Sequence, residues 1–546
     1  MSERGSDQGG LAERQDPSEP ADASAPSAEE HAVEPAPPSA TASTKEAKRN
    51  LRDKAVRAAG WTIAAGLLAR VLGIVGSLGI TYFLDPAAIG EVQLAVILCF
   101  TANQFTLLGY GQYLVAKPDE GPDTVFHVTV LHLGLGAVAF AVILALGVPL
   151  GHWFHSPLLM RYLPWMVVAV AFERLYFVPE RVLIRELDFP RVAVARSLSE
   201  LTYSISSVGL AVLGFGGMAI LYGNIARGIV RLFITWRFVP REAWLTPTKL
   251  RMDVYKRILR FGLPLGVSQA FAFANTRFDN LVMKRLFGAD IMGRYTLAYN
   301  LADVPAEQIG EQIAEVLLPS FARMTPEDRK NAIVRVTGII ALVIFPVAVG
   351  FGAVALTAER LMRSNWFGIG NMLMVLCVMS ITRPLCSKAH SYLQATDRTL
   401  RITQLEAFKL VAVISCIYAF SRFGPLWSCF GVGLAFLMEL SLAWYIMSRG
   451  DNIPYSAFFK RLLPPLLACV PMVAAVEATR RGLLLVLPDR KPFVVLSLAI
   501  QMLVGAVAYG AGAMLLARTQ ANEFLALTRS ALQRRRGKAE PAPASG

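Results

Sequence analysis

A row of acidic residues on one predicted helix is the first feature of the sequence that could support chemistry. Asp303, Glu307, Glu311 and Glu315 follow one another at intervals of four within the apolar stretch 291–319. This spacing places the four carboxylates on one face of an α-helix. Such a face is costly against lipid and must meet water or a partner. Two interpretations stay open: a path for a proton or a sodium ion, or the wall of a wet vestibule without a coupling role.

Cations and amides at membrane depth form a second group of candidates. Arg70 lies midway along the apolar segment 58–83, where it either binds an anionic head group or pairs with a carboxylate. Arg277 and Asp279 are two residues apart and diverge by about 200° on a helix, so each needs another partner or water. We therefore expect a solvated substrate cavity. Its predicted lining is Arg70, Arg227, Arg231, Asn275, Arg277, Asp279, Arg383 and Lys388.

For the remaining charged residues, histidines and cysteines, the sequence favours structural roles. Glu406 and Lys409 are three apart and can pair with each other. His152 and His155 lack a third ligand nearby, so no metal site is expected. The six cysteines form no CxxC pair and are expected as small buried residues without disulfides. Glu173 and Arg174 flank a predicted short helix and are interpreted as interfacial residues, and Glu439 and Glu477 are further charges in or beside apolar segments.

The elements that must position these residues are membrane-spanning helices. Of the 546 residues, 54% are hydrophobic and only 17% are charged, and the mean hydropathy is +0.46. Apolar blocks recur at the length of roughly 20 residues that crosses a bilayer. We expect an all-α polytopic membrane protein with about fourteen transmembrane helices. The predicted spans are 58–83, 91–116, 125–150, 160–180, 193–213, 216–237, 258–286, 291–319, 332–357, 368–395, 402–420, 424–447, 459–480 and 492–517.

The distribution of basic residues predicts the orientation of these helices. With the amino terminus in the cytoplasm, 33 Lys and Arg lie near cytoplasmic segments and 11 near the opposite loops. This bias predicts cytoplasmic location of both termini in a bacterial inner membrane. It also accounts for the net charge of +14 without nucleic acid as a partner.

An internal repeat indicates how the helices are grouped. Residues 84–90 and 287–293 resemble each other at a constant offset of 203 residues, which covers about six helices. Parallel repeats of this kind are a transporter design, although two similar turns can also arise by coincidence. The expected organisation is a disordered cytoplasmic tail, two six-helix lobes, two further helices and a basic cytoplasmic tail. The corresponding ranges are 1–50, 51–240, 241–450, 451–517 and 518–546.

Several enzyme signatures are absent from the sequence. There is no GxxxxGK[ST] loop for ATP, no GxSxG elbow and no HExxH motif. No loop between the predicted spans is long enough for a soluble catalytic domain. We therefore expect a transporter and not an enzyme, with no cofactor.

Four stretches carry a resemblance to a known family. They are FLDPAAIG (83–90), LGYGQYLV (108–115), LIRELDF (183–189) with GFG (214–216), and 261–299, followed by Pro319 and Phe321. In order and spacing the chain resembles the polysaccharide-unit (Wzx-type) flippases of the multidrug/oligosaccharidyl-lipid/polysaccharide exporter superfamily. Asp85, where that family has glycine, and the acidic face of 291–319 depart from the pattern.

The resemblance implies a fold and a function. It implies two six-helix lobes around a central cavity plus two C-terminal helices, with alternating access by rocking of the lobes. The implied substrate is an undecaprenyl-diphosphate-linked oligosaccharide repeat unit, flipped from the cytoplasmic to the periplasmic leaflet for polysaccharide export. A polysaccharide polymerase and an export machinery are the implied partners. The energy source stays open between a proton gradient, a sodium gradient and consumption of the product.

Three other functions compete with this one. A lipid II flippase and a cation-coupled drug antiporter belong to the same superfamily, and acidic and aromatic lining would favour the antiporter. A membrane-embedded glycosyltransferase or polymerase would need a large periplasmic loop, which the predicted spans do not leave.

Overall fold

The computed structural model of the protein is built from α-helices, with no strand among its described residues. These are 73, 76, 78–117, 119–486, 488 and 490–526; the side chains of 304–320, 322 and 323 are not described. The chain divides into Met1–Ala55 and Val56–Gly546, and all described residues belong to the second unit. Its longer helices are α2 (Pro86–Phe105), α3 (Tyr110–Ala116), α4 (Pro122–Ala145), α5 (Gly147–Trp153), α6 (Leu159–Arg185), α7 (Phe189–Val212), α8 (Met218–Phe238), α9 (Met252–Arg323), α10 (Pro326–Glu359), α11 (Ile369–Met379), α12 (Thr382–Ala395), α13 (Thr399–Ser421), α14 (Pro425–Asp451), α15 (Tyr455–Val486) and α16 (Lys491–Leu516).

The helices match the apolar blocks of the sequence. Each predicted span from 91–116 to 492–517 is covered by one helix or by two in succession, which confirms the all-α prediction. Nine helices in the described part of the chain are long and apolar enough to cross a membrane. The total of fourteen stays a prediction, because the span 58–83 lies mostly outside the described residues, as does the tail 1–50.

The longest helix, α9, is a helical hairpin. Its backbone is helical except at Gly288, whose φ of 86° is in the region that favours glycine. Tyr295 donates a hydrogen bond to Asp279 at 2.6 Å, although sixteen residues of continuous helix would span about 24 Å. The chain therefore reverses at Gly288, and its two arms correspond to the predicted spans 258–286 and 291–319.

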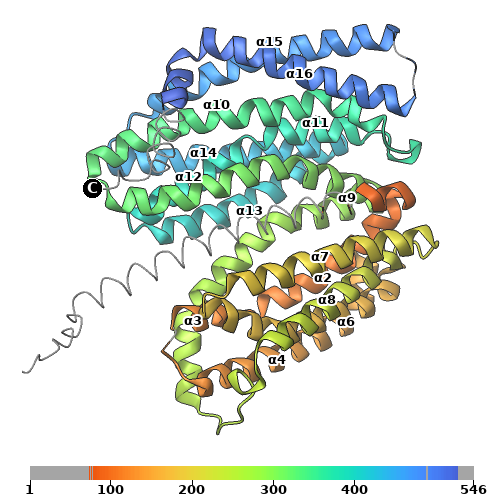
Figure 1. Ribbon diagram of the computed structural model, residues 1–546, viewed down its shortest axis with the longest axis vertical. Coiled ribbons are helices and arrows are strands. Elements are labelled where there is room, and N and C mark those ends of the chain that lie inside the picture. The colour runs from red at the N-terminus through yellow and green to blue at the C-terminus, as the bar shows by residue number, and fades with distance from the viewer. Residues whose placement is uncertain are drawn as a thin grey trace, which may run out of the picture. The chain divides into compact units, whose positions relative to one another are not determined.

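The helices pack in two sets that share contacts with α9 (Figure 1). In the first set α6 packs against α2, α4 and α8, and α8 packs against α7. In the second set α14 packs against α11, α12 and α13, and α10 packs against α11. The α15–α16 pair lies against α10. The predicted lobe boundaries at 240 and 450 stay a prediction.

The two repeated turns lie against each other. Gly90 faces the backbone of Ala289, and Gly293 faces the backbone of Pro86, so closely that a Cβ atom on either glycine would overlap a carbonyl oxygen. Pro86 and Ala289 are equivalent positions of the repeat, as are Gly90 and Gly293. Each half therefore offers the other the same small-residue surface, and a chance similarity does not explain this reciprocal contact.

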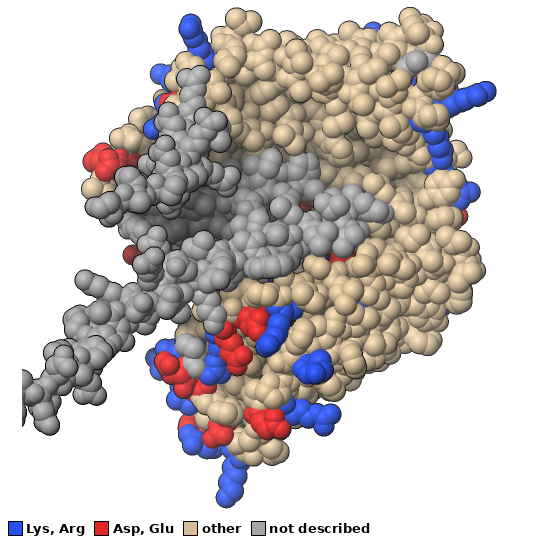
Figure 2. Space-filling view, in the orientation of Figure 1, with Lys and Arg blue, Asp and Glu red and all other residues tan. Residues whose placement is uncertain are grey.

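The surface agrees with a membrane environment. On the face shown in Figure 2, Lys, Arg, Asp and Glu gather mainly at the lower left, with a few at the upper left and the right edge, and the tan area from the top to the right is mostly uncharged. Exposed large apolar side chains are numerous, among them Phe233 and Leu515. Apolar side chains on this scale are stable against lipid and not against water.

Candidate functional site

A polar chamber lies between α9 and three helices of the second set, α12, α13 and α14. Its volume is about 420 Å³. Asn275, Tyr299 and Asp303 line it from α9, and Arg383 and His390 line it from α12. The charged and aromatic lining from α13 and α14 is Glu406, Lys409, Phe436 and Glu439.

Arg383 is the cation best placed to meet a ligand in this chamber. Its guanidinium pairs with the Asp303 carboxylate of α9. It also lies 4.2 Å from the Tyr299 ring centroid and 4.6 Å from that of Phe436. Aromatic faces hold a guanidinium by cation–π attraction. The fixed, planar donor group suits bidentate binding of a phosphate or carboxylate, provided that the ligand replaces Asp303.

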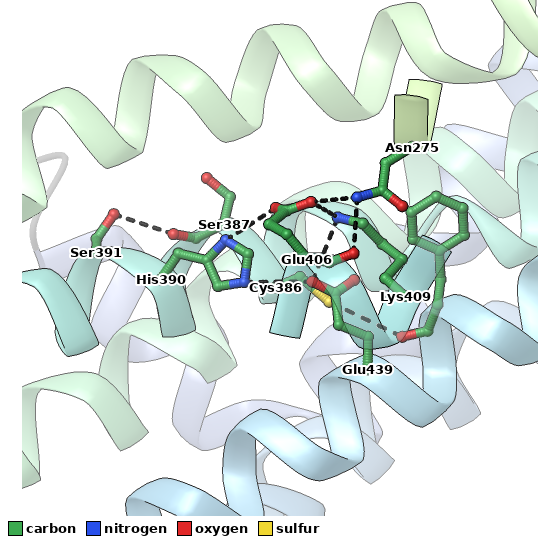
Figure 3. A network of polar contacts seen from close by, with 9 residues as sticks. Asn275, Cys386, Ser387, His390, Ser391, Glu406, Lys409 and Glu439 are labelled. Atoms are coloured by element: carbon green, nitrogen blue, oxygen red, sulfur yellow. Dashed lines mark hydrogen bonds and ion pairs between the residues drawn. The ribbon is translucent and has the colours of Figure 1, made fainter. Parts of the chain in front are cut away.

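A second charged group, the His390 cluster, consists of His390, Glu406, Lys409 and Glu439 (Figure 3). The Lys409 Nζ atom lies 2.9 Å from Glu406 Oε2 and 3.3 Å from Glu439 Oε1. Glu439 is fully buried and Lys409 is 8% exposed. The predicted pairing of Glu406 with Lys409 is confirmed, and the pair is part of a larger network.

The imidazole of His390 closes this network. Its Nδ1 atom is 3.6 Å from Glu406 Oε1, and its Nε2 atom is 3.2 Å from Glu439 Oε1. Asn275 of α9 donates to the Glu406 backbone oxygen at 3.0 Å and to Oε2 at 2.6 Å. The cluster thus links α9 to α12, α13 and α14.

The donor atoms of His390, Glu406 and Glu439 would suit a metal ion by type. They lie within 4.8 Å of one another. The Lys409 ammonium, however, already lies between the two carboxylates. A fixed positive charge at that distance repels a divalent cation, so we assign no metal site.

The predicted substrate-cavity residues divide by location. Arg383 and Asn275 line the chamber, and so does Asp303, a predicted ion-coupling residue. Asp279 and Lys388 are 2% and 1% exposed and are not part of its lining. Arg277 is partly buried on the same α9 arm. Arg70, and the side chains of Glu307 and Glu311, lie outside the described residues.

Arg227 and Arg231 lie in the first set of helices, away from the chamber. Arg231 donates two hydrogen bonds of 2.9 Å to Glu180, and Glu180 also accepts from Arg196. Arg227 bonds to Asn224 at 2.7 Å and approaches Glu200 at 3.6 Å. Their role in binding substrate stays a prediction.

Arg174 corrects a prediction from the sequence. The sequence predicts that Glu173 and Arg174 flank a short helix at the membrane interface, but α6 continues from Leu159 to Arg185. Arg174 is 3% exposed and donates to the backbone oxygens of His132 and Asn103 at 2.7 and 3.1 Å. The interfacial interpretation of Arg174 is therefore wrong.

The sequence reasoning missed two contributions. His390 lies seven residues after Arg383, which is two helical turns along the same face, and this spacing could have revealed it. Lys284 of α9 and Glu91 of α2 form a buried ion pair at 2.5 Å, but 193 residues separate them and no local spacing marks such a contact.

Comparison with known proteins shows which family the chain belongs to. The lipopolysaccharide biosynthesis protein WzxC of Escherichia coli (strain K12) is 22% identical over 410 residues, covering 73% of this chain and 82% of that protein. The succinoglycan biosynthesis transport protein ExoT of Rhizobium meliloti (strain 1021) is 24% identical over 477 residues, covering 85% and 92%.

Solved structures show the same fold. The lipid II flippase MurJ in an inward closed conformation aligns with a TM-score of 0.67 at 14% identity, covering 84% of this chain and 98% of MurJ. An inward-facing multidrug resistance MATE family transporter aligns with a TM-score of 0.56 at 17% identity, covering 72% and 96%. The fold predicted from the sequence motifs is confirmed. Residues 80–369, more than half of the chain, match the family of polysaccharide biosynthesis proteins, and the protein belongs to that family.

Proposed function

We propose that the protein flips a lipid-linked oligosaccharide, built on undecaprenyl diphosphate, from the cytoplasmic to the periplasmic leaflet of the bacterial inner membrane. The oligosaccharide enters the chamber while the lipid tail stays in the bilayer. A polysaccharide polymerase and an export machinery then receive the product. Alternating access moves the chamber from one side of the membrane to the other.

The observation that supports this proposal is a charged chamber inside membrane-spanning helices of a polysaccharide biosynthesis family member. Arg383 supplies the cation for a diphosphate or an acidic sugar, and Tyr299 and Phe436 supply aromatic faces. Hydroxyl-rich sugars need polar partners such as Asn275 and Asp303. An apolar cavity would leave these hydroxyls without hydrogen bonds.

The test is polymer export in a strain that lacks the gene and carries a plasmid copy. Arg383→Ala is expected to lower export about tenfold or more, because one charge-assisted hydrogen bond contributes about 1.5–3 kcal/mol. Arg383→Lys keeps the charge and loses the bidentate geometry. Polymer export by this variant should therefore lie between that of wild type and that of Arg383→Ala. The control is Arg422→Ala, which changes an exposed arginine between α13 and α14.

Full export by Arg383→Ala, at wild-type protein level in the membrane, would contradict the role of Arg383. The alternatives are separated by the lipid that accumulates in the deletion strain. Lipid-linked oligosaccharide supports the proposal, whereas lipid II supports peptidoglycan precursor flipping. Unchanged lipids with increased drug sensitivity support an antiporter.

A further inference from the structure

The His390 cluster holds charged side chains to which the proposed function gives no role. We propose that it takes up and releases one proton, held on the His390 imidazole, during the transport cycle. What the proton drives rests on the function proposed above, whereas the binding of the proton does not. The argument uses charge, geometry and the neighbouring groups in turn.

The charge of the cluster is unbalanced when His390 is neutral. Glu406 and Glu439 then contribute two negative charges and Lys409 one positive charge. A net charge inside membrane-spanning helices is costly to keep. One proton on His390 makes the four side chains neutral together.

The position of the imidazole suits its protonated form. Its Nδ1 and Nε2 atoms lie at ion-pair distance from different carboxylates, 3.6 Å from Glu406 and 3.2 Å from Glu439, although neither contact meets hydrogen-bond geometry in this arrangement. A neutral imidazole carries hydrogen on one nitrogen only, so it can donate to one of the two carboxylates at most. The imidazolium carries hydrogen on both nitrogens. Glu439, fully buried, also has an Oε2 atom without a hydrogen-bond partner among the described residues.

The surrounding groups that the structure describes do not supply the missing positive charge. On the α9 and α12 side, Asp303 and Arg383 neutralise each other, and Asn275 is uncharged. Cys386, from α12, contacts the Phe436 carbonyl oxygen. Lys388 precedes His390 by two residues and so points about 200° away around α12.

The helix α10, which also packs against α12, adds apolar side chains. Ile340, Ile344 and Phe345 are buried there with Leu385 and Ala389. Because these side chains are apolar, the polar side of the cluster is the chamber. Protons reach His390 from the chamber, which is large enough for water. A proton moves from this water to the imidazole and returns to it, and no other bond is made or broken.

A sodium ion would also balance the charge, and the contacts favour the proton. The position between Glu406 and Glu439 is filled by the Lys409 ammonium.

The bonds from Asn275 to Glu406 connect the cluster to α9, and α9 packs against α2 of the first set. A change of charge on His390 thus acts on a contact that leads out of the second set.

The test observes the proton directly. Protein labelled with ¹⁵N-histidine is placed in phosphatidylethanolamine–phosphatidylglycerol liposomes, and the ring signals lost in His390→Gln are assigned to His390. The imidazolium signal is expected at the acidic end of the pH series and the neutral-ring signal at its alkaline end. Glu439→Gln removes one of the two negative charges beside His390. The His390 ring of this variant should therefore lose its proton at a lower pH than the ring of the wild type.

Two results would overturn the proposal. A ring that stays neutral from about pH 5 to about pH 9 takes up no proton. A ring whose signals move on replacing potassium with sodium, at constant pH, indicates a sodium site. Neither result depends on transport, and Glu439→Gln provides the comparison if His390→Gln does not fold.

A second measurement asks what the proton drives. Liposomes with an imposed pH gradient flip a fluorescent undecaprenyl-diphosphate oligosaccharide, and the rate is compared with and without the gradient. In His390→Gln this ratio should fall to about one, because a group that binds no proton cannot respond to it. His152→Gln, at an exposed histidine, should keep the wild-type ratio. A gradient response kept by His390→Gln contradicts the proposal, whereas absence of any wild-type flipping contradicts the proposed function alone.

Discussion

At the scale of single residues, one buried ion pair joins two separate helices. Lys284 is 2% exposed, and its Nζ atom lies 2.5 Å from Glu91 on α2. Ser156 also donates to Glu91. An ion pair of this kind stabilises little by itself, but removal of one partner leaves a buried charge uncompensated.

Lys284→Met is therefore expected to destabilise the protein by about 3–5 kcal/mol. The measurement is the thermal unfolding midpoint of the purified protein in detergent. Glu91→Gln combined with Lys284→Met removes both charges and should recover much of the loss. Lys330→Met, whose partner Glu327 is 79% exposed, should change the midpoint little. An equal midpoint in wild type and Lys284→Met would show that the pair is not formed.

At the scale of elements, a carboxylate fastens the loop between α3 and α4. Glu120 accepts hydrogen bonds from Thr124 and Tyr113, both at 2.7 Å, and Arg257 of α9 lies 4.0 Å away. The hydrogen bond from Thr124, followed by that from Tyr113, lowers the pKa of Glu120. The loop is thus tied to α3, α4 and α9 by the ionised form of one residue.

The lowered pKa gives the sign of a pH effect. A carboxyl whose folded pKa is below its unfolded value of about 4.3 stabilises the fold fully above that pH, and the contribution is lost as the pH falls toward the folded pKa. Glu120→Gln should therefore lower the unfolding midpoint at neutral pH and weaken its decline on acidification. Asp119→Asn, at an exposed neighbour, should behave as wild type; an unchanged acid decline in Glu120→Gln would refute the assignment.

The elements themselves were largely predictable, and the site was so in part. Long apolar blocks define helices through bilayer thickness alone, and even the two arms of α9 followed from the gap at Gly288. The lining by Arg383 and Asn275 followed from the cost of charge in lipid. The network around His390 could not be predicted in this way, because its residues come from four different helices. Their charges lie close together only after these helices have packed. Packing of helix faces, unlike helix length, is not encoded in a local period.

At the scale of the whole molecule, the distribution of basic residues predicts the orientation of the chain in the membrane. The predicted cytoplasmic side includes the loop after α8, and the predicted outer side includes the loop between α13 and α14. A membrane-impermeant maleimide added to spheroplasts should label Phe423→Cys and not Thr246→Cys. The background is a chain without its six native cysteines. Labelling of position 246 alone would reverse the predicted orientation.

The reciprocal contact of the two turns has a consequence for how the halves fit together. Gly90 and Gly293 relate to each other as the same residue does in the two subunits of a homodimer, where one patch meets its own copy. A side chain at either glycine would meet a carbonyl oxygen of the opposite turn. The two positions therefore guard a single seam, and one methyl group on either side is enough to push the turns apart.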